Sequence, residues 1–201
     1  DLKTRGRIMT EEMTKAALRK RFLAERESLT DREYNILQDL LLINFQRLSL
    51  PPLATVHSYL PMLDRREPNP LPMVRWLQFK FPGLRTAAPR SDFNDMSMTH
   101  WLIHEHSRFE LNAKGIPEPS MSEEVSPMSF DLVIVPLLAF DEQGDRVGYG
   151  KGFYDRFLAE CSTRCLRVGL SFFDPVEKIA DTDTFDVAMD YCITPEQVYE
   201  F

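Results

Sequence analysis

A continuously apolar segment places the strongest constraint on how this chain folds. In DLVIV, residues 131–135, four apolar residues follow an Asp, and Pro136 ends the run. A strand with one face in water alternates between apolar and polar residues, so an unbroken apolar run is typical of a strand covered on both faces of a parallel sheet. We therefore expect a sheet with helices packed on both sides.

The segments around this strand alternate between strand and helix patterns. Apolar segments of strand length are predicted at 54–60, 84–89, 98–103, 165–170 and around 191–194, and helices at about 70–81 and 152–162. This succession predicts βαβ units, hence an α/β fold with a mostly parallel central sheet flanked by helices. The segment 114–127, rich in Pro, Ser and Glu, is expected to cross the surface irregularly.

Two helices are predicted in front of the sheet. Thr10, followed by two glutamates, suits the start of the first, with apolar residues at helical spacing as far as Phe22. The second opens with a capping-box pattern, from Thr30 to Glu33, and Pro51 ends it. We expect a frayed end at 1–10 and a single α/β domain, with this N-terminal helical pair, over 11–201.

Composition and charge exclude several broad classes of protein. A formal net charge of −7 over 201 residues disfavours nucleic-acid binding. The three cysteines contain no C-x-x-C pair, which favours a reducing, cytoplasmic location. The longest apolar runs are far shorter than the ~20 residues of a membrane helix. We expect a cytoplasmic protein that binds small molecules, without a membrane or an obligatory protein partner.

The stretch GDRVGYGKGFYDR, residues 144–156, holds four of the eight glycines of the chain. It follows a buried strand and precedes a helix, where parallel sheets bind their ligands. The alternating Gly148, Gly150 and Gly152 let backbone amides converge on an anion, and Arg146 and Lys151 add positive charge. Its spacing matches neither the P-loop nor the dinucleotide pattern. A phosphate site and a glycine-rich turn with solvated charges both remain open.

Other charged residues have two interpretations each. Asp155 lies four residues after Lys151 and either pairs with it or binds a metal carried by a nucleotide. Lys15 and Arg19 share a helix face, which is either solvated or a ligand contact. Two aromatic residues, Phe153 and Tyr154, precede Asp155. They either pack against the rest of the protein or stack on a flat ligand.

Three histidines, His100, His104 and His106, invite a metal interpretation that the pattern disfavours. MTHWLI, residues 98–103, is predicted as a strand, so the histidines lack the helical spacing of a zinc motif, and H-E-x-x-H is absent. The sequence also lacks a G-x-S-x-G elbow and a catalytic-cysteine pattern.

One long segment resembles a known family signature. DLVIVPLLAFDEQGDRVGYGKGFYDRFL, residues 131–158, closely resembles that of the 5-formyltetrahydrofolate cyclo-ligases, also called 5,10-methenyltetrahydrofolate synthetases. Four shorter segments support the resemblance: KAALRKRF (15–22), APR (88–90), GIPEP (115–119) and FDVAMDYCITP (185–195). Together they are spread along the chain from residue 15 to residue 195.

The resemblance implies an enzyme that uses ATP and Mg²⁺ to close 5-formyltetrahydrofolate into 5,10-methenyltetrahydrofolate, releasing ADP and phosphate. It implies catalytic roles for Lys15, Arg146 and Lys151. The implied ATP contacts are Lys15, Arg19, Arg146, Gly148, Gly150, Lys151, Gly152, Phe153 and Tyr154. The implied folate contacts are Leu60, Glu67, Tyr149, Lys151 and Phe153. Asp155 is the implied metal ligand, with Asp186 as its companion and Asp190 as the alternative to Asp186.

The chain departs from the family pattern in three places. Leu137 stands where the family has Gly, so its backbone must avoid positive φ. Arg65 and Arg66 look like insertions before Glu67, and Phe153 replaces a Tyr. A non-catalytic ATP- or folate-binding relative and a sugar-phosphate enzyme on a similar scaffold remain as alternatives, because a fold alone does not determine function.

Overall fold

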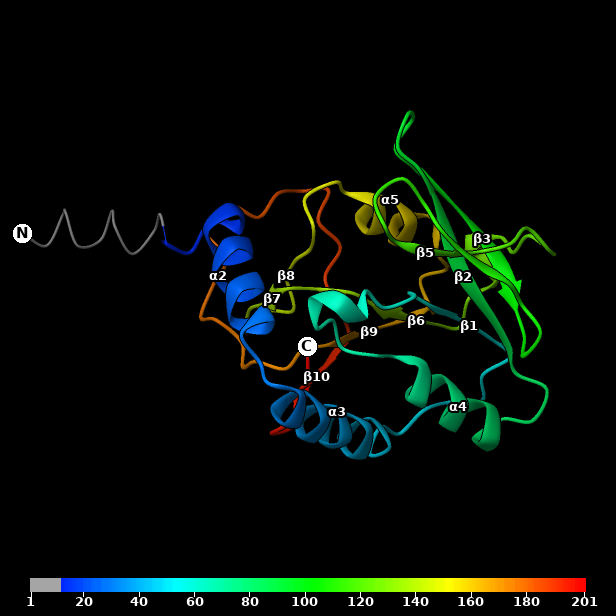
Figure 1. Ribbon diagram of the computed structural model, residues 1–201, viewed down its shortest axis with the longest axis horizontal. Coiled ribbons are helices and arrows are strands. Elements are labelled where there is room, and N and C mark those ends of the chain that lie inside the picture. Colours follow the sequence, from blue (N-terminus) through cyan, green and yellow to red (C-terminus); the bar gives the residue numbers. More distant parts are fainter. Residues whose placement is uncertain (1–11) are drawn as a thin grey trace, which may run out of the picture.

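A central sheet separates two layers of helices in the computed structural model, which describes residues 12–201 (Figure 1). Within these residues seven strands form this sheet, in the order β11 (Val198–Glu200), β10 (Tyr191–Ile193), β9 (Leu166–Leu170), β6 (Leu132–Val135), β1 (Thr55–Ser58), β2 (Arg85–Asp92) and β3 (Ser97–Ile103). The strands from β10 to β2 are parallel, and only the two edge strands are antiparallel. The predicted mostly parallel α/β fold is confirmed.

Helices cover both faces of the sheet. The helices are α2 (Lys15–Glu27), α3 (Asp31–Phe45), α4 (Leu71–Lys80) and α5 (Phe153–Glu160), with 3-10 turns at η1 (Leu63–Arg65) and η2 (Pro127–Ser129). Figure 1 shows α3 and α4 on one side of the sheet and α5 on the other. Short hairpins pair β4 (Phe109–Leu111) with β5 (Pro117–Pro119), and β7 (Ala139–Phe140) with β8 (Arg146–Val147).

The apolar run in β6 is buried on both faces, as its sequence predicts. Leu132 and Ile134 pack in the core beneath α3 and α4, together with Phe45 of α3. The alternate residues of β6, Val133 and Val135, pack with α5 on the opposite face. Since all four side chains are fully buried, a polar residue at any of these positions would lose its hydration without a partner.

Helix α2 begins within the predicted first helix, after Thr14. Thr10 lies outside the described residues, and a turn and a bend at Met13 and Thr14 interrupt the chain before α2 begins. Thr14 is the N-cap of α2, and its side chain accepts a hydrogen bond from the Ala17 amide. The predicted start at Thr10 is therefore not tested, while Thr14, four positions later, caps α2. The capping box at Thr30, in contrast, is confirmed.

The segment 114–127 is more regular than expected. Its residues Pro117–Pro119 form β5, and Glu124 makes an isolated bridge to Trp101. Proline is compatible with a short strand in a two-stranded hairpin, where it can occupy positions whose amide is not needed for pairing. Outside β5 and this bridge, most of the segment is irregular, as predicted.

No helix in the described part of the chain, residues 12–201, has the length and apolarity needed to cross a membrane. Leu137, which follows the strand-ending Pro136, is not among the non-glycine residues with positive φ in this range.

Candidate active site

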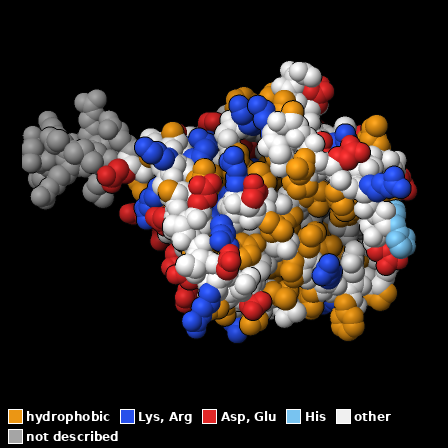
Figure 2. Space-filling view, in the orientation of Figure 1, with side chains coloured by type: hydrophobic (Ala, Val, Ile, Leu, Met, Phe, Trp, Pro, Cys, Tyr) orange, Lys and Arg blue, Asp and Glu red, His pale blue; other side chains and the backbone are white. Residues whose placement is uncertain are grey.

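A cavity of about 970 Å³ opens where the parallel strands β1 and β6 end. Its wall includes Leu60 and Pro136, which follow these strands, and the glycine loop 148–152. Helix α2 contributes Lys15 and Arg19, and the β2–β3 and β4–β5 hairpins contribute the opposite side. The volume lies at the upper end of the range for small-molecule sites. On the face shown in Figure 2, basic and apolar side chains gather side by side between α2 and the β2–β3 hairpin.

The glycine loop is tightly folded against Arg19. Gly150 (φ +89°) and Gly152 (φ +69°) adopt left-handed conformations, and Gly152 is the N-cap of α5. A Cβ atom at Gly150 would lie 3.1 Å from Cζ of Arg19. The absence of a side chain lets Arg19 donate from Nε to the Gly148 carbonyl at 2.9 Å. The glycines therefore place a guanidinium directly against the loop that opens onto the cavity.

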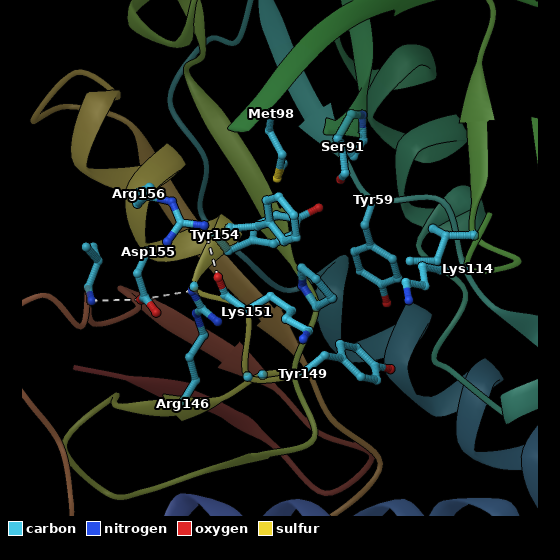
Figure 3. A pocket seen from close by; sticks show the side chains of 18 of the residues that line it. Tyr59, Ser91, Met98, Lys114, Arg146, Tyr149, Lys151, Tyr154, Asp155 and Arg156 are labelled. Carbon is cyan, nitrogen blue, oxygen red and sulfur yellow. Dashed lines mark hydrogen bonds and ion pairs between the residues drawn. The ribbon is translucent and has the colours of Figure 1, made fainter. Parts of the chain in front are cut away.

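Arg146 and Asp155 form an ion pair beside this loop. Arg146 Nη2 and the Val187 amide donate to the same Asp155 oxygen, Oδ1, each at 3.1 Å (Figure 3). Burial lowers the pKa of Arg146, and the Asp155 carboxylate opposes that effect. Nε of Arg146 is buried and has no hydrogen-bond partner among residues 12–201. A positive charge with an unused donor thus lies in the wall of the cavity.

Of the two interpretations of Asp155, the pairing with Lys151 is wrong, because Asp155 pairs with Arg146. Gly152 turns the chain in a left-handed conformation between them, so Lys151 precedes α5 and helical i, i+4 spacing does not apply. Lys151 is exposed and lines the cavity, and its backbone carbonyl accepts from Arg156 (Figure 3).

Lys15 lies next to the acidic segment that precedes β10. Its Nζ donates to Asp186 Oδ2 and lies 3.7 Å from Asp183 Oδ2. Burial acts to lower the pKa of Lys15, but the hydrogen bond and charge of Asp186 raise it above its ordinary value. Asp190, the alternative metal ligand, instead accepts hydrogen bonds from Arg167 at the start of β9. Of the two candidate aspartates, the structure places Asp186 in the cavity wall.

A buried hydrogen-bond chain forms another part of the wall. Glu67 is 2% exposed, and its Oε2 accepts from the Met62 amide at 2.8 Å. Its Oε1 accepts from the Tyr149 hydroxyl at 2.9 Å, and that hydroxyl accepts from Arg26 Nη2 at 2.7 Å. Burial raises the pKa of Glu67, while the Met62 amide and the charge of Arg26 oppose the rise. The extra residues Arg65 and Arg66 are absorbed by η1 and a left-handed turn, so Glu67 still faces the cavity.

Aromatic residues line the side near the β2–β3 hairpin. Phe153 packs edge-on against Phe93, with ring centroids 5.3 Å apart, and Arg156 lies 5.6 Å from the Phe153 ring. Tyr154 lines the cavity too, and its hydroxyl is buried without a hydrogen-bond partner in the described part of the chain. Both aromatic residues therefore pack and also face the cavity.

Several lining residues were missed by sequence reasoning. They are Tyr59, Ser91, Phe93, Met98, Lys114 and Arg156, most of them shown in Figure 3. Lys114 immediately precedes the GIPEP segment, and its place beside that family motif could have marked it as a site residue. The others lie in strands or turns whose local pattern predicts packing alone.

The histidines divide between the core and the surface. Nδ1 of His100 lies 3.0 Å from Nε2 of His57, and both rings are buried among Phe130 and Phe157. Burial lowers the pKa of His57, and lowers that of His100 to about 4. His100 is thus a neutral core residue, and His104 is exposed. Among residues 12–201, no group of three or more His, Cys, Asp and Glu side chains could hold a metal ion.

Comparison with known proteins gives a consistent match. A model of the 5-formyltetrahydrofolate cyclo-ligase family matches residues 11–195. The 5-formyltetrahydrofolate cyclo-ligase of Escherichia coli (strain K12) is 29% identical over 160 residues, 77% of this chain and 86% of the relative. A probable 5-formyltetrahydrofolate cyclo-ligase of Schizosaccharomyces pombe is 31% identical over 133 residues, 58% of this chain and 64% of the relative.

Solved structures agree with this match. The NMR structure of Aquifex aeolicus 5,10-methenyltetrahydrofolate synthetase has a TM-score of 0.75 and 29% identity, and the alignment covers 92% of both chains. A 5,10-methenyltetrahydrofolate synthetase from Mycoplasma pneumoniae has a TM-score of 0.69 at 22% identity, covering 90% of this chain and 98% of that one, which supports the fold alone. Since the family model spans nearly the whole chain, this protein belongs to the 5-formyltetrahydrofolate cyclo-ligase family.

Proposed function

We propose that this protein uses ATP and Mg²⁺ to convert 5-formyltetrahydrofolate into 5,10-methenyltetrahydrofolate, releasing ADP and phosphate. The observation that carries the proposal is that one cavity collects the cationic side chains of α2, the glycine loop, a pair of carboxylates and the buried Glu67. These groups come from distant parts of the sequence. A plain glycine-rich turn gives no reason for this convergence.

The chemistry needs a phosphate-binding end because a formamide oxygen is a poor leaving group. In the proposed reaction this oxygen attacks the γ-phosphorus of ATP, and ADP leaves. The lone pair of the folate N10 then adds to the formyl carbon, the carbon–oxygen bond breaks, and phosphate departs with that oxygen. N10 loses its proton, and a double bond delocalised over N5, carbon and N10 remains. Positioning and charge stabilisation supply most of the rate in such phosphoryl transfers.

The basic side chains of the cavity suit the phosphate end. Lys15 and Arg19 approach from α2, and Lys151 extends from the loop without a carboxylate partner that would neutralise it in the described chain. Arg146 adds a buried charge whose Nε is unused. We assign the γ-phosphate to Lys15, Arg146 and Lys151. Backbone amides of the glycine loop and Arg19 hold the remaining phosphates, as at other helix N-termini.

The carboxylates of Asp155 and Asp186 fit a magnesium ion carried by the nucleotide. Mg²⁺ bound with ATP takes one or two protein carboxylates and otherwise uses phosphate oxygens and water, so a larger carboxylate cluster is not needed. Both aspartates line the cavity, and the charges of both act on Arg146. When bound, the ion neutralises phosphate charge.

The buried Glu67 suits the folate end. A carboxylate held by one backbone amide and one phenol keeps lone pairs for the N–H donors of a pterin ring. Tyr149 is bonded to Glu67, Leu60 lines the same cavity, and Phe153 offers a ring for the flat part of the substrate. We assign Leu60, Glu67, Tyr149, Lys151 and Phe153 to folate binding.

The decisive experiment follows the absorbance of methenyltetrahydrofolate after 5-formyltetrahydrofolate is added, with and without ATP and Mg²⁺. We expect formation only when all three components are present, with one ADP per methenyl group. Calorimetric binding of both substrates without product would indicate a non-catalytic binding protein. Turnover of a sugar phosphate without ATP would indicate the other alternative.

A further inference from the structure

Helix α2 carries an arginine at a position where its own pattern calls for an apolar residue. Leu18, Phe22 and Arg26 follow one another at intervals of four, and all three are buried. Leu18 and Phe22 pack in one apolar cluster beneath the glycine loop. Arg26 continues this face but is a charged residue, only 3% exposed.

The contacts of Arg26 do not fully compensate for its burial. Its Nη1 is buried and has no hydrogen-bond partner among residues 12–201. Burying a charge with an unused donor is unfavourable, so packing alone does not explain an arginine here. The two contacts it makes are both to the cavity wall. Nε donates to the Arg65 carbonyl at 3.0 Å, and Nη2 donates to the Tyr149 hydroxyl at 2.7 Å.

These contacts join three segments that are distant in sequence. Arg65 precedes Glu67 by two residues, so its carbonyl fixes the loop that carries this carboxylate. Tyr149 belongs to the glycine loop, and Cζ of Arg26 lies 5.8 Å from its ring centre. Arg26 itself shares α2 with Lys15 and Arg19. One guanidinium therefore ties the proposed phosphate end to the proposed folate end.

Arg26 fixes the direction of the two hydrogen bonds that link Arg26, the Tyr149 hydroxyl and Glu67. A guanidinium has donors and no acceptor, so the Tyr149 hydroxyl must accept from Arg26. The single proton of that hydroxyl is then free to be donated to Glu67 Oε1. Since the Met62 amide holds Oε2, the plane of the carboxylate is set from both sides.

We propose that Arg26 is a positioning residue for folate binding: acting through the Tyr149 hydroxyl and the Arg65 carbonyl, it holds the Glu67 carboxylate in the orientation that receives the substrate. Arg26 is absent from the cavity wall itself, so it acts without touching the substrate. This inference rests on the proposed function, because it takes Glu67 as a folate contact.

Arg26 also influences the charge state of Glu67. The titratable groups that act on this carboxylate or are influenced by it are Arg26, Tyr34, Tyr59, Arg65, Tyr149 and Tyr154. Arg26 and Arg65 are the cations among them, and both oppose the rise in the Glu67 pKa that burial causes. Loss of Arg26 therefore makes protonation of Glu67 easier. In this proposal folate binding requires the ionised carboxylate. As the pH is lowered, a variant without Arg26 should therefore lose folate affinity at a higher pH than wild type does.

The test measures binding of 5-formyltetrahydrofolate by calorimetry from pH 5 to pH 9, without ATP, so that it does not depend on turnover. For Arg26→Met we expect binding about tenfold or more weaker at pH 7 and an acid limb displaced to higher pH. ATP binding should stay within about twofold of wild type, since Lys15, Arg19 and Lys151 are unchanged. Arg26→Lys should recover part of the affinity, because lysine restores the charge and one donor.

Arg21→Met is the matched control, because Arg21 is an exposed arginine of the same helix that pairs with Glu25. It should bind both ligands as wild type does. The inference is overturned if folded Arg26→Met keeps the wild-type affinity and acid limb, or loses ATP and folate binding equally. Should Arg26→Met not fold, Tyr149→Phe decides, because it removes the hydroxyl that links Arg26 to Glu67, and wild-type folate affinity with an unchanged acid limb in this variant overturns the inference. Failure of wild type to bind 5-formyltetrahydrofolate would contradict the proposed function instead.

Discussion

Arg146 donates to Asp155 across 3.1 Å, and the two side chains differ sharply in their surroundings: the arginine side chain is 5% exposed and the carboxylate 25%. The buried cation is held in place by a carboxylate that still reaches the cavity. In the proposed function, Asp155 therefore orients the arginine assigned to phosphate and also meets the cation carried by the nucleotide.

Asp155→Asn separates these two contributions. Weakening the partner of a buried guanidinium should lower the free energy of unfolding by about 1–3 kcal/mol. Loss of a proposed metal ligand should raise the Mg²⁺ concentration for half-maximal turnover by roughly tenfold or more. Asp190→Asn is the matched control, since it also weakens an arginine–carboxylate pair, at Arg167. A wild-type Mg²⁺ dependence in Asp155→Asn would show that Asp155 is not a metal ligand.

Lys151→Met tests the exposed cation of the glycine loop. Because Lys151 is exposed and its side chain forms no ion pair among residues 12–201, the melting temperature should stay close to that of wild type. Loss of one charge on the transferring phosphoryl group should lower kcat by about 10²–10³-fold. Steady-state assays of the purified variant measure this effect. Lys20→Met, an exposed lysine of α2, serves as control, and equal activity of the two variants would contradict the assignment.

The fold and the glycine loop were predictable because their signals are local. The apolar run of β6 reports burial on both faces through four consecutive residues, and helices at 71–80 and 153–160 lie within two residues of their predicted ends. The edge strand β11 and the short hairpins of β4 with β5 and β7 with β8 were not predicted, and their strands have only two or three residues each.

The pairing of side chains in the site was less accessible. One of the two interpretations of Asp155, pairing with Lys151, applied helical spacing across Gly152, whose left-handed conformation ends that spacing. The contact of Arg26 with Tyr149 joins residues 123 apart, and that of Tyr149 with Glu67 joins residues 82 apart. No local pattern marks such contacts, because they depend on how the loops pack over the sheet.

Gly150→Ala tests why position 150 is glycine. The reason is either the left-handed backbone conformation or the close approach of the Arg19 guanidinium. Alanine at φ +89° should cost about 1–2 kcal/mol of stability. Gly83→Ala is a matched control, because Gly83 has φ +84° but no atom within 4 Å of its added Cβ. At Gly150 that Cβ would lie 3.1 Å from Arg19, so this variant alone should raise the KM for ATP, by about tenfold. Equal KM values in both variants would rule out close approach as the reason.

Glu67→Gln should stabilise the free protein in a pH-dependent way while it weakens folate binding. Burial raises the pKa of Glu67 in the folded protein above its ordinary value of 4.5. A carboxyl group with a raised folded-state pKa favours folding most when it is protonated, and this contribution is lost as the pH rises through the folded-state pKa. Glutamine stays neutral at every pH. The free energy of unfolding of Glu67→Gln, relative to wild type, should therefore increase from pH 5 to pH 8 in urea titrations. Glu142→Gln, at an exposed position, should show no such trend. A relative stability that falls over this range would mean that the folded protein prefers a charged Glu67, and that Arg26 and the Met62 amide outweigh its burial.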